Sequence, residues 1–367
     1  MAEKHAAEEQ EEAEGHPLME SQQTGGLIGF DELMDSIKKA IEAYYSGEKS
    51  NIAVISEPFS GRTSLIYEAA KIRKETTTLH SLSCVLKEEG FLDKLDRSKD
   101  IVLLDNCHFL YMRKIGGFEM LERFLDFVAS SEKLFITTWN LFSWNYLTRI
   151  FRLESIFPAQ LSPPKLSADD LKKLMLAQYD SKPIFADESS LAEDNALRHC
   201  LQISKKNISF GYLNRSLEIP ILKVNCDLLI SKLAGKIKTK KEEPEVSLED
   251  RIFERLREAS EGNPGVAKSI WEQIVKTTNV KPEDISKPQF KIELNFDDAF
   301  VLYIILSTES ITKSELEDVA DMDIDMDQLL YNFARLGLIS MDGELCKIKP
   351  EALHSLEGHL KGIRLVW

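Results

Sequence analysis

The fold is decided by the stretch Asn51-Ile-Ala-Val-Ile-Ser56-Glu-Pro-Phe-Ser-Gly61-Arg62-Thr63-Ser64. Its first six residues form a short apolar run, typical of a buried parallel strand. A loop follows, and the apolar spacing predicts a helix from Leu65 to Lys74. The loop approximates the phosphate-binding pattern G-x-x-x-x-G-K-[ST], which requires a strand before it and a helix after it.

Strand-like runs and helical segments alternate on the C-terminal side of this stretch. The further strands are predicted at Thr76–Leu82, Asp100–Leu104, Leu134–Thr138 and Pro158–Leu161. Strands that alternate with helices indicate an α/β fold with a parallel sheet covered on both faces. We therefore predict a P-loop NTPase core with a parallel sheet.

The pattern changes after Leu166. Ser167 is a good N-cap for a helix, and the break at Gly262–Gly265 precedes another helix. We expect irregular structure from Ser181 to Ser247, including an exposed linker at Gly235–Pro244. Near the C-terminus, three helical segments precede two β runs around an Asp-Gly turn, an order that predicts a winged helix-turn-helix.

Four regions are expected in all. They are a disordered acidic tail (1–24), a nucleotide-binding core (25–165), a helical lid with an inserted linker (166–290) and a winged helix-turn-helix (291–367).

Composition narrows the class of protein. The net charge of −15 disfavours non-specific binding to nucleic acid or anionic membranes. The five cysteines form no C-x-x-C pair, which is typical of reduced thiols in a cytoplasmic protein. No apolar run approaches the roughly 20 residues that span a bilayer. We expect a cytoplasmic protein without a membrane span.

The loop carries most of a phosphate site. Gly61 would let the backbone approach phosphates, and the helix N-terminus would supply N–H donors. Thr63 could place its hydroxyl on Mg²⁺. Arg62 stands where the pattern has lysine, and its forked guanidinium is wider than an ammonium group. The residues expected to contact ATP are Ser56, Glu57, Pro58, Phe59, Ser60, Gly61, Arg62, Thr63 and Ser64.

A second feature supports this interpretation. Asp105 follows four apolar strand residues, where an aspartate would hold Mg²⁺ together with Thr63. Asn106 comes next, and an amide can orient water but cannot take its proton. The site therefore favours ATP binding with slow hydrolysis or none; the alternative is an ordinary strand–turn–helix junction. For His108 we favour a structural hydrogen-bonding role over polarising a water.

The order of these motifs resembles the archaeal AAA/STAND ATPases, including relatives of archaeal replication initiators. The stretches that carry the resemblance are Ser56–Thr63, Asp105, Thr138–Asn140 and Gly262–Gly265. It implies a phosphate-loop strand and an Asp105 strand separated by a third, a helical lid and a winged helix. It also implies that Thr138 or Asn140 senses the γ-phosphate, and that Arg149 or Arg152 reaches a neighbouring subunit's nucleotide in an oligomer. The arginine that often follows the lid turn is missing, and Lys268 is a weak substitute.

The leading hypothesis is an ATP-binding regulatory switch with Asp105, Asn106 and Asn140 as candidate catalytic residues. From Lys291 to Trp367 there are 15 acidic residues against 7 Lys and Arg. Phosphates would be repelled by such a segment, so we expect the winged helix to bind a protein partner. A DNA-binding initiator-like or transcription-related protein and a pseudo-ATPase scaffold are the alternatives.

Overall fold

The computed structural model describes residues 27–87, 90–179, 183–185, 201–210, 215–224, 247–276, 280–320 and 324–366. The expected acidic tail at 1–24 and the linker at Gly235–Pro244 lie outside these residues.

A five-stranded parallel sheet forms the core. Its strands are β1 (Ile52–Ser56), β2 (Thr77–Ser81), β3 (Ile101–Asp105), β4 (Leu134–Asn140) and β5 (Ala159–Leu161), in the order β2-β3-β4-β1-β5. All five predicted strands are confirmed, and β4 separates β1 from β3 as the resemblance implied. Every residue of β1, β3 and β4 is buried, because helices cover both faces of the sheet.

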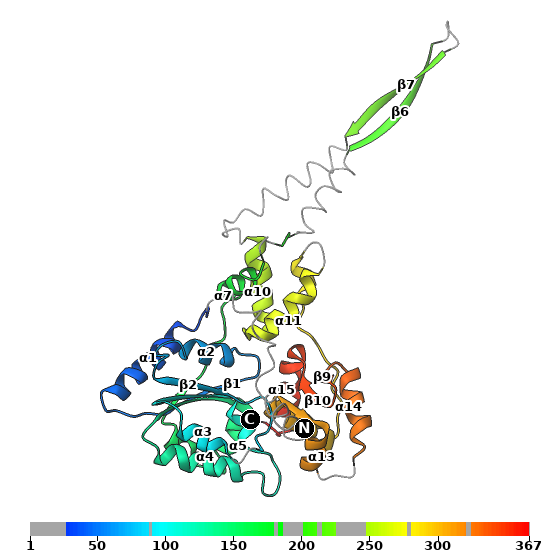
Figure 1. Cartoon of the computed structure of the whole chain (residues 1–367). Coiled ribbons are helices and arrows are strands. Elements are labelled where there is room, and N and C mark those ends of the chain that lie inside the picture. Colours follow the sequence, from blue (N-terminus) through cyan, green and yellow to red (C-terminus); the bar gives the residue numbers. More distant parts are fainter. Residues whose placement is uncertain are drawn as a thin grey trace, which may run out of the picture.

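Helices of the core lie on both sides of this sheet. Figure 1 shows α1 (Asp31–Tyr45) and α2 (Arg62–Ala69) on one face, and α3 (Phe91–Asp96) and α4 (Glu119–Ser130) on the other. The predicted helix Leu65–Lys74 begins earlier and ends earlier, as α2. Gly61, in the left-handed conformation at φ 90°, starts the helix directly after the loop. Two short helices, α5 (Leu141–Leu147) and α6 (Leu153–Ile156), lie between β4 and β5.

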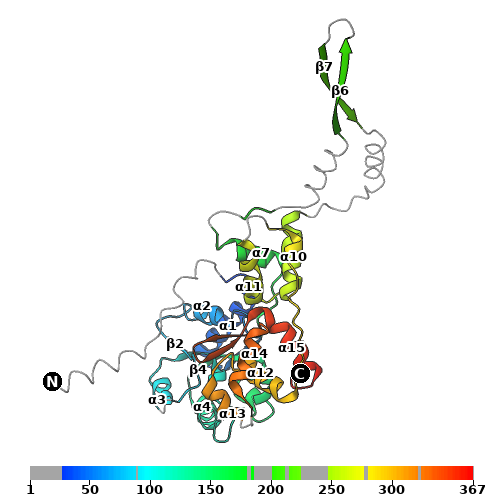
Figure 2. The ribbon, with the colours of Figure 1, turned by 90° about the vertical axis from the view of Figure 1, so that its right-hand side faces the viewer.

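Three helices lie in the region predicted to be a lid, and the segment that they form is here called the lid. They are α7 (Ala168–Leu176), α10 (Leu248–Ser260) and α11 (Pro264–Val275), and they lie beyond α1 and α2 in both views (Figures 1 and 2). The side chains of Ser167 and Asn263 accept backbone N–H groups at the starts of α7 and α11. These caps confirm the predicted helix starts.

The prediction of irregular structure from Ser181 to Ser247 is wrong in part. β6 (Leu201–Phe210) and β7 (Arg215–Val224) pair as an antiparallel hairpin. The polar run Lys205–Asn207 and Pro220 interrupt the apolar alternation by which such strands are recognised.

The chain ends in a unit that runs from α12 to α15, here called the C-terminal unit. It contains α12 (Phe296–Thr308), β8 (Ser310–Thr312), α13 (Lys313–Ala320), α14 (Met326–Arg335), β9 (Ile339–Asp342), β10 (Leu345–Ile348) and α15 (Leu353–Gly362). The three predicted helices and the hairpin are present, while β8 and α15 are additional. β10 lies between β8 and β9 in a three-stranded antiparallel sheet. None of the helices in the described part of the chain is long and apolar enough to cross a membrane.

Candidate functional site

The ends of three strands bring the expected site residues together. In a parallel sheet all carboxyl ends lie at one edge, so Ser56, Asp105 and Asn140 end β1, β3 and β4 at the same edge. Ser56 pairs in register with Asn140. The β1–α2 loop, Glu57–Gly61, begins at this edge and leads into α2, whose first N–H groups no capping side chain accepts.

Arg62 lies inside the site and is 5% exposed. Its Nη1 donates to the backbone oxygens of Ser56 (2.6 Å) and Trp139 (2.9 Å). Its Nη2 donates to Glu309 Oε1 in an ion pair. The guanidinium expected to bind phosphate thus binds a carboxylate of the C-terminal unit.

Glu309 was not predicted from the sequence. It directly follows α12 and has a φ of 63°, a conformation that non-glycine residues rarely adopt. Its Oε1 also accepts a hydrogen bond from Asn140 Nδ2 at 2.9 Å. Burial alone would raise the pKa of Glu309, but the Arg62 charge and the Asn140 amide outweigh burial and hold that pKa below its usual value. Glu309 therefore enters the site as an anion.

Asn140 and Thr138, the two candidates for a γ-phosphate sensor, have different partners. Asn140 is fully buried, and its Oδ1 caps α5 through the N–H groups of Phe142 and Ser143. Its Nδ2 donates to Leu306 O (2.9 Å) as well as to Glu309. Asn140 therefore contacts the last turn of α12, whereas Thr138 contacts Asp105.

Asp105 is fully buried and lies beside Thr63. Thr138 Oγ1 donates to its Oδ1 at 2.5 Å, and its Oδ2 accepts no hydrogen bond from the described residues. Burial raises the pKa of Asp105, and the Thr138 and Thr63 hydroxyls offset this only in part. A buried carboxylate oxygen without a partner and a nearby hydroxyl are oxygen ligands that fit Mg²⁺.

Asn106 and His108 both follow β3, and each has surroundings that the sequence did not predict. Asn106 has a φ of 62°, and its Nδ2 donates to Leu82 O at 3.0 Å. His108 is fully buried in a short 3-10 helix (Cys107–Leu110), and neither ring nitrogen has a hydrogen-bond partner among the described residues. The hydrogen-bonding role favoured for His108 is therefore wrong for this structure. Burial lowers the pKa of His108 to about 4, so its ring is neutral at pH 7.

The start of α11, in the lid, contacts the β1–α2 loop. Gly265 N donates to Phe59 O at 2.9 Å, and Asn263 Nδ2 donates to Pro58 O at 2.9 Å. A Cβ on Gly265 would lie 2.6 Å from the Cβ of Phe59, so only glycine allows this approach. The Phe30 ring lies 3.3 Å from the Cβ position of Gly61.

The remaining predicted residues have the following surroundings. The hydroxyls of Ser56 and Ser60 bond to each other, and Ser64 is exposed. Arg149 and Arg152 are exposed. Lys268 forms an ion pair with Glu272 at 3.8 Å.

An open hollow of about 500 Å³ lies between the segment before α7 and the end of α10. Its lining comes from Lys165–Ser167 before α7, from Arg257, Glu258 and Glu261 of α10 and its end, and from Gly262. Lys165 Nζ lies 3.9 Å from Glu57 Oε1, so the hollow adjoins the β1–α2 loop.

Neither a protein-family model nor a curated protein sequence matches this chain. Among solved structures, the chain is similar to the Thermotoga maritima RuvB Holliday junction branch migration motor, with a TM-score of 0.38 and 15% identity over 92% of this chain and 95% of that chain. It is also similar to the Aeropyrum pernix Orc1 protein in complex with DNA, with a TM-score of 0.36 and 13% identity over 93% of this chain and 95% of that one. Likeness at this level supports no residue role and no ligand.

Proposed function

We propose that this chain is an ATP-binding regulatory switch of the AAA/STAND kind, in which ATP and Glu309 compete for Arg62. The observation that carries the proposal is the ion pair between buried Arg62 and partly exposed Glu309 at the carboxyl edge of the sheet. A guanidinium binds carboxylate and phosphate oxygens with the same forked geometry. A γ-phosphate entering along α2 would therefore take the position that Glu309 holds.

The surroundings of Arg62 support phosphate as the competitor. Gly61 and the uncapped N-terminus of α2 provide backbone N–H donors next to the guanidinium. Thr63 and Asp105 supply oxygen ligands for the Mg²⁺ that accompanies ATP. The hollow that adjoins the β1–α2 loop through Lys165 has room for the base and ribose.

Release of Glu309 would loosen the C-terminal unit. Glu309 and Leu306 are the residues at the end of α12 that bond to Arg62 and Asn140. A ligand shifts an equilibrium only through its different affinity for the two states. ATP would favour the state in which Glu309 is withdrawn, and the position of the C-terminal unit would report the bound nucleotide.

Hydrolysis in this proposal is slow or absent. Asn106 lacks a carboxylate to accept the proton of an attacking water, and its amide donates to Leu82 O. Asp105 and Thr63 would hold Mg²⁺, and Asn140 would contact the γ-phosphate after losing Glu309. Arg149 or Arg152 remains a candidate for contact with a neighbouring subunit's nucleotide.

The test is a titration of ATP with Mg²⁺ into the wild-type protein and the isosteric variant Glu309→Gln. Because the variant removes the competing charge, its affinity for ATP should rise about tenfold, or about 1.4 kcal/mol. Glu315→Gln is the matched control, since Glu315 belongs to the same unit and contacts Lys87 rather than Arg62. If neither the wild type nor Glu309→Gln binds with a dissociation constant below about 1 mM, the proposal fails.

A pseudo-ATPase scaffold is the second candidate. The lid favours it, because Asn263 and Gly265 bond to the carbonyls of Pro58 and Phe59, and Phe30 lies over Gly61. In such a scaffold the Arg62–Glu309 pair joins core and C-terminal unit permanently. Thermal-shift titration separates the two candidates, because only a ligand of the native state raises the unfolding temperature.

For the partner, we interpret the C-terminal unit as a winged helix that contacts protein. Its α14 begins with Asp325 and Asp327, and Tyr331 on the same helix is 68% exposed. Acidic groups at the start of this helix oppose contact with DNA phosphates, and an exposed aromatic side chain suits a protein interface. DNA binding remains the alternative, and salt-dependent retention on duplex DNA would support it.

A further inference from the structure

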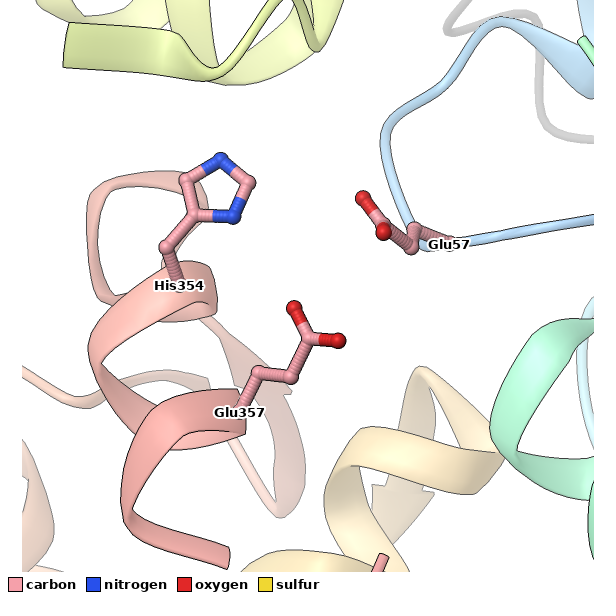
Figure 3. A group of neighbouring side chains, drawn as sticks. All are labelled: Glu57, His354 and Glu357. Carbon is pink, nitrogen blue, oxygen red and sulfur yellow. The ribbon is translucent and has the colours of Figure 1, made fainter. Parts of the chain in front are cut away.

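A second cluster joins the β1–α2 loop to the C-terminal unit, away from Arg62. Glu57 of the loop and His354 and Glu357 of α15 each offer one ligand atom, and these atoms lie within 4.8 Å of one another. Figure 3 shows the three side chains turned toward a common centre between loop and helix. His354 and Glu357 are three residues apart on α15, which places them on one face of the helix.

Among the three residues, His354 gives the strongest indication of a ligand, because one of its ring nitrogens is buried without a hydrogen bond from the described residues. Its side chain is 6% exposed, and its Nε2 lies 2.9 Å from Ser260 O. That contact makes Nε2 the donor, so the neutral ring presents Nδ1 as an acceptor. Nδ1 is buried, has no hydrogen-bond partner among the described residues, and points toward the two glutamates (Figure 3).

This arrangement is the usual one around a metal-binding histidine. One ring nitrogen binds the metal while the other donates to a backbone carbonyl, which fixes the tautomer and the ring orientation. Glu261 provides a further carboxylate, since its Oε2 lies 3.7 Å from His354 Nδ1. We propose that Glu57, His354 and Glu357 bind a divalent cation of the Zn²⁺ class, with Glu261 as a third carboxylate beside them.

The ligand types select the cation. Zn²⁺ is bound by imidazole nitrogen and carboxylate oxygen, often through three protein ligands with a water in the fourth position. Mg²⁺ and Ca²⁺ prefer oxygen alone. Metal–ligand bonds of about 2.0–2.1 Å put tetrahedral ligand atoms about 3.4 Å apart, so the glutamate side chains must move inward by roughly 1 Å.

Lysines already neutralise part of this cluster. Lys165 Nζ lies 3.9 Å from Glu57 Oε1, and Lys361 Nζ lies 2.7 Å from Glu357 Oε1. Glu261 pairs with Lys287 at 2.6 Å and with Lys165 at 3.7 Å. A carboxylate has two oxygens, so one can face a lysine while the other binds the cation. The competing arrangement is an ion-pair network without metal, in which no lysine moves.

Bound metal would hold α15 against the loop independently of Glu309. Glu57 belongs to the loop, Glu357 to α15, and Ser260 and Glu261 to the end of α10, so the site joins three parts of the chain. Because binding to the native state stabilises it, the metal should raise the unfolding temperature.

The experiment is a Zn²⁺ titration of chelator-treated full-length protein, followed by calorimetry and thermal unfolding. It uses a Cys84→Ser background, because Cys84 is an exposed thiol that could bind Zn²⁺ by itself. We expect one Zn²⁺ per chain and a rise in unfolding temperature. Loss of a residue that only hydrogen-bonds to a metal ligand lowers metal affinity by about 10-fold to 100-fold. Because His354 is itself a proposed ligand, the affinity of His354→Gln for Zn²⁺ should fall by more than that.

His359→Gln is the matched control, since His359 lies on the same helix outside the cluster. It should bind Zn²⁺ like the parent protein. Glu57→Gln provides a second test from the loop, should His354→Gln not fold. Co²⁺ in place of Zn²⁺ should give visible d–d bands without a thiolate charge-transfer band. Absence of stoichiometric binding, or equal affinity in the parent, His354→Gln and Glu57→Gln, would overturn the proposal in favour of the ion-pair network.

Discussion

The β1–α2 loop is held from two sides by contacts of different chemistry. On the side of the C-terminal unit, the charged pair Arg62–Glu309 joins the end of the loop to α12. On the side of the lid, Asn263 and Gly265 donate uncharged hydrogen bonds to backbone carbonyls of the loop. A phosphate can replace a carboxylate at a guanidinium, but it cannot replace a carbonyl that accepts from an amide.

The difference assigns separate tasks to the two sides. The charged contact responds to anions and to pH, because its strength depends on ionisation. The lid contact responds to neither, and it fixes the backbone conformation of the loop. A switch that detects phosphate therefore needs the C-terminal side, while the lid keeps the loop in place.

The largest effect is expected from Arg62→Ala. The substitution removes the donor to the carbonyls of Ser56 and Trp139 and the charged partner of Glu309, which keeps the Asn140 amide. Removing one partner of a fully buried pair costs about 3–5 kcal/mol. Because the Glu309 side chain is partly exposed, we expect the free energy of unfolding in urea to fall by about 3 kcal/mol, the lower end of that range. The double variant Arg62→Ala/Glu309→Ala should recover part of the loss. A loss below about 1 kcal/mol, as for surface pairs, would contradict a buried contact.

The second effect is a pH dependence of stability that comes from His108, a buried ring whose pKa is also influenced by the charges of Glu309 and Arg62. The folded protein keeps this ring neutral down to about pH 4, whereas the unfolded chain takes up a proton near pH 6.5. The unfolded state thus binds more protons between these values, and stability is full above pH 6.5 and is lost as the pH falls toward 4. The free energy of unfolding of the wild type, measured in urea, should fall by about 2–3 kcal/mol between pH 6.5 and pH 4.5.

The control for this effect is His108→Phe, which fills the same space with an apolar ring. Since both nitrogens of His108 lack partners, the variant should unfold at about the same free energy at pH 7 and lose the slope below 6.5. Glu309, whose pKa is lowered, contributes stability that is lost only below its usual value of 4.5, outside the window. Identical slopes in both proteins would show that His108 does not titrate as argued.

The core could be predicted from the sequence because its signals are local. Ile52–Ser56 and the other buried strands of the sheet are each a short apolar run in the sequence. Gly61 and Ser167 directly precede the helices whose starts they indicate. The meeting of Thr63 with Asp105 also follows from topology, since parallel strands end at one edge.

The partner of Arg62 could not be predicted in this way. Glu309 is 247 residues away in sequence, and nothing around it distinguishes it from the other acidic residues of the C-terminal unit. Packing of α12 against the start of α5 helps to bring it to the loop. The helix α15 did leave a signal that was missed: Leu353, Leu356 and Leu360 recur at helical spacing and are all buried. Recognising it would have placed His354 and Glu357 on one helix.

The smallest effect belongs to the lid side, and Asn263 measures it. Asn263→Ala removes the N-cap of α11 and the donor to Pro58 O, so the free energy of unfolding should fall by about 1–2 kcal/mol. Asn263→Asp keeps an oxygen for the cap but loses the amide donor, which separates the two contributions. Asn263→Ala introduces no titrating group and should therefore keep the wild-type slope between pH 6.5 and 4.5, whereas Asn263→Asp adds a carboxyl of its own and is compared at pH 7 only. A changed slope would mean that the two sides of the loop are coupled, and that the lid also takes part in sensing charge.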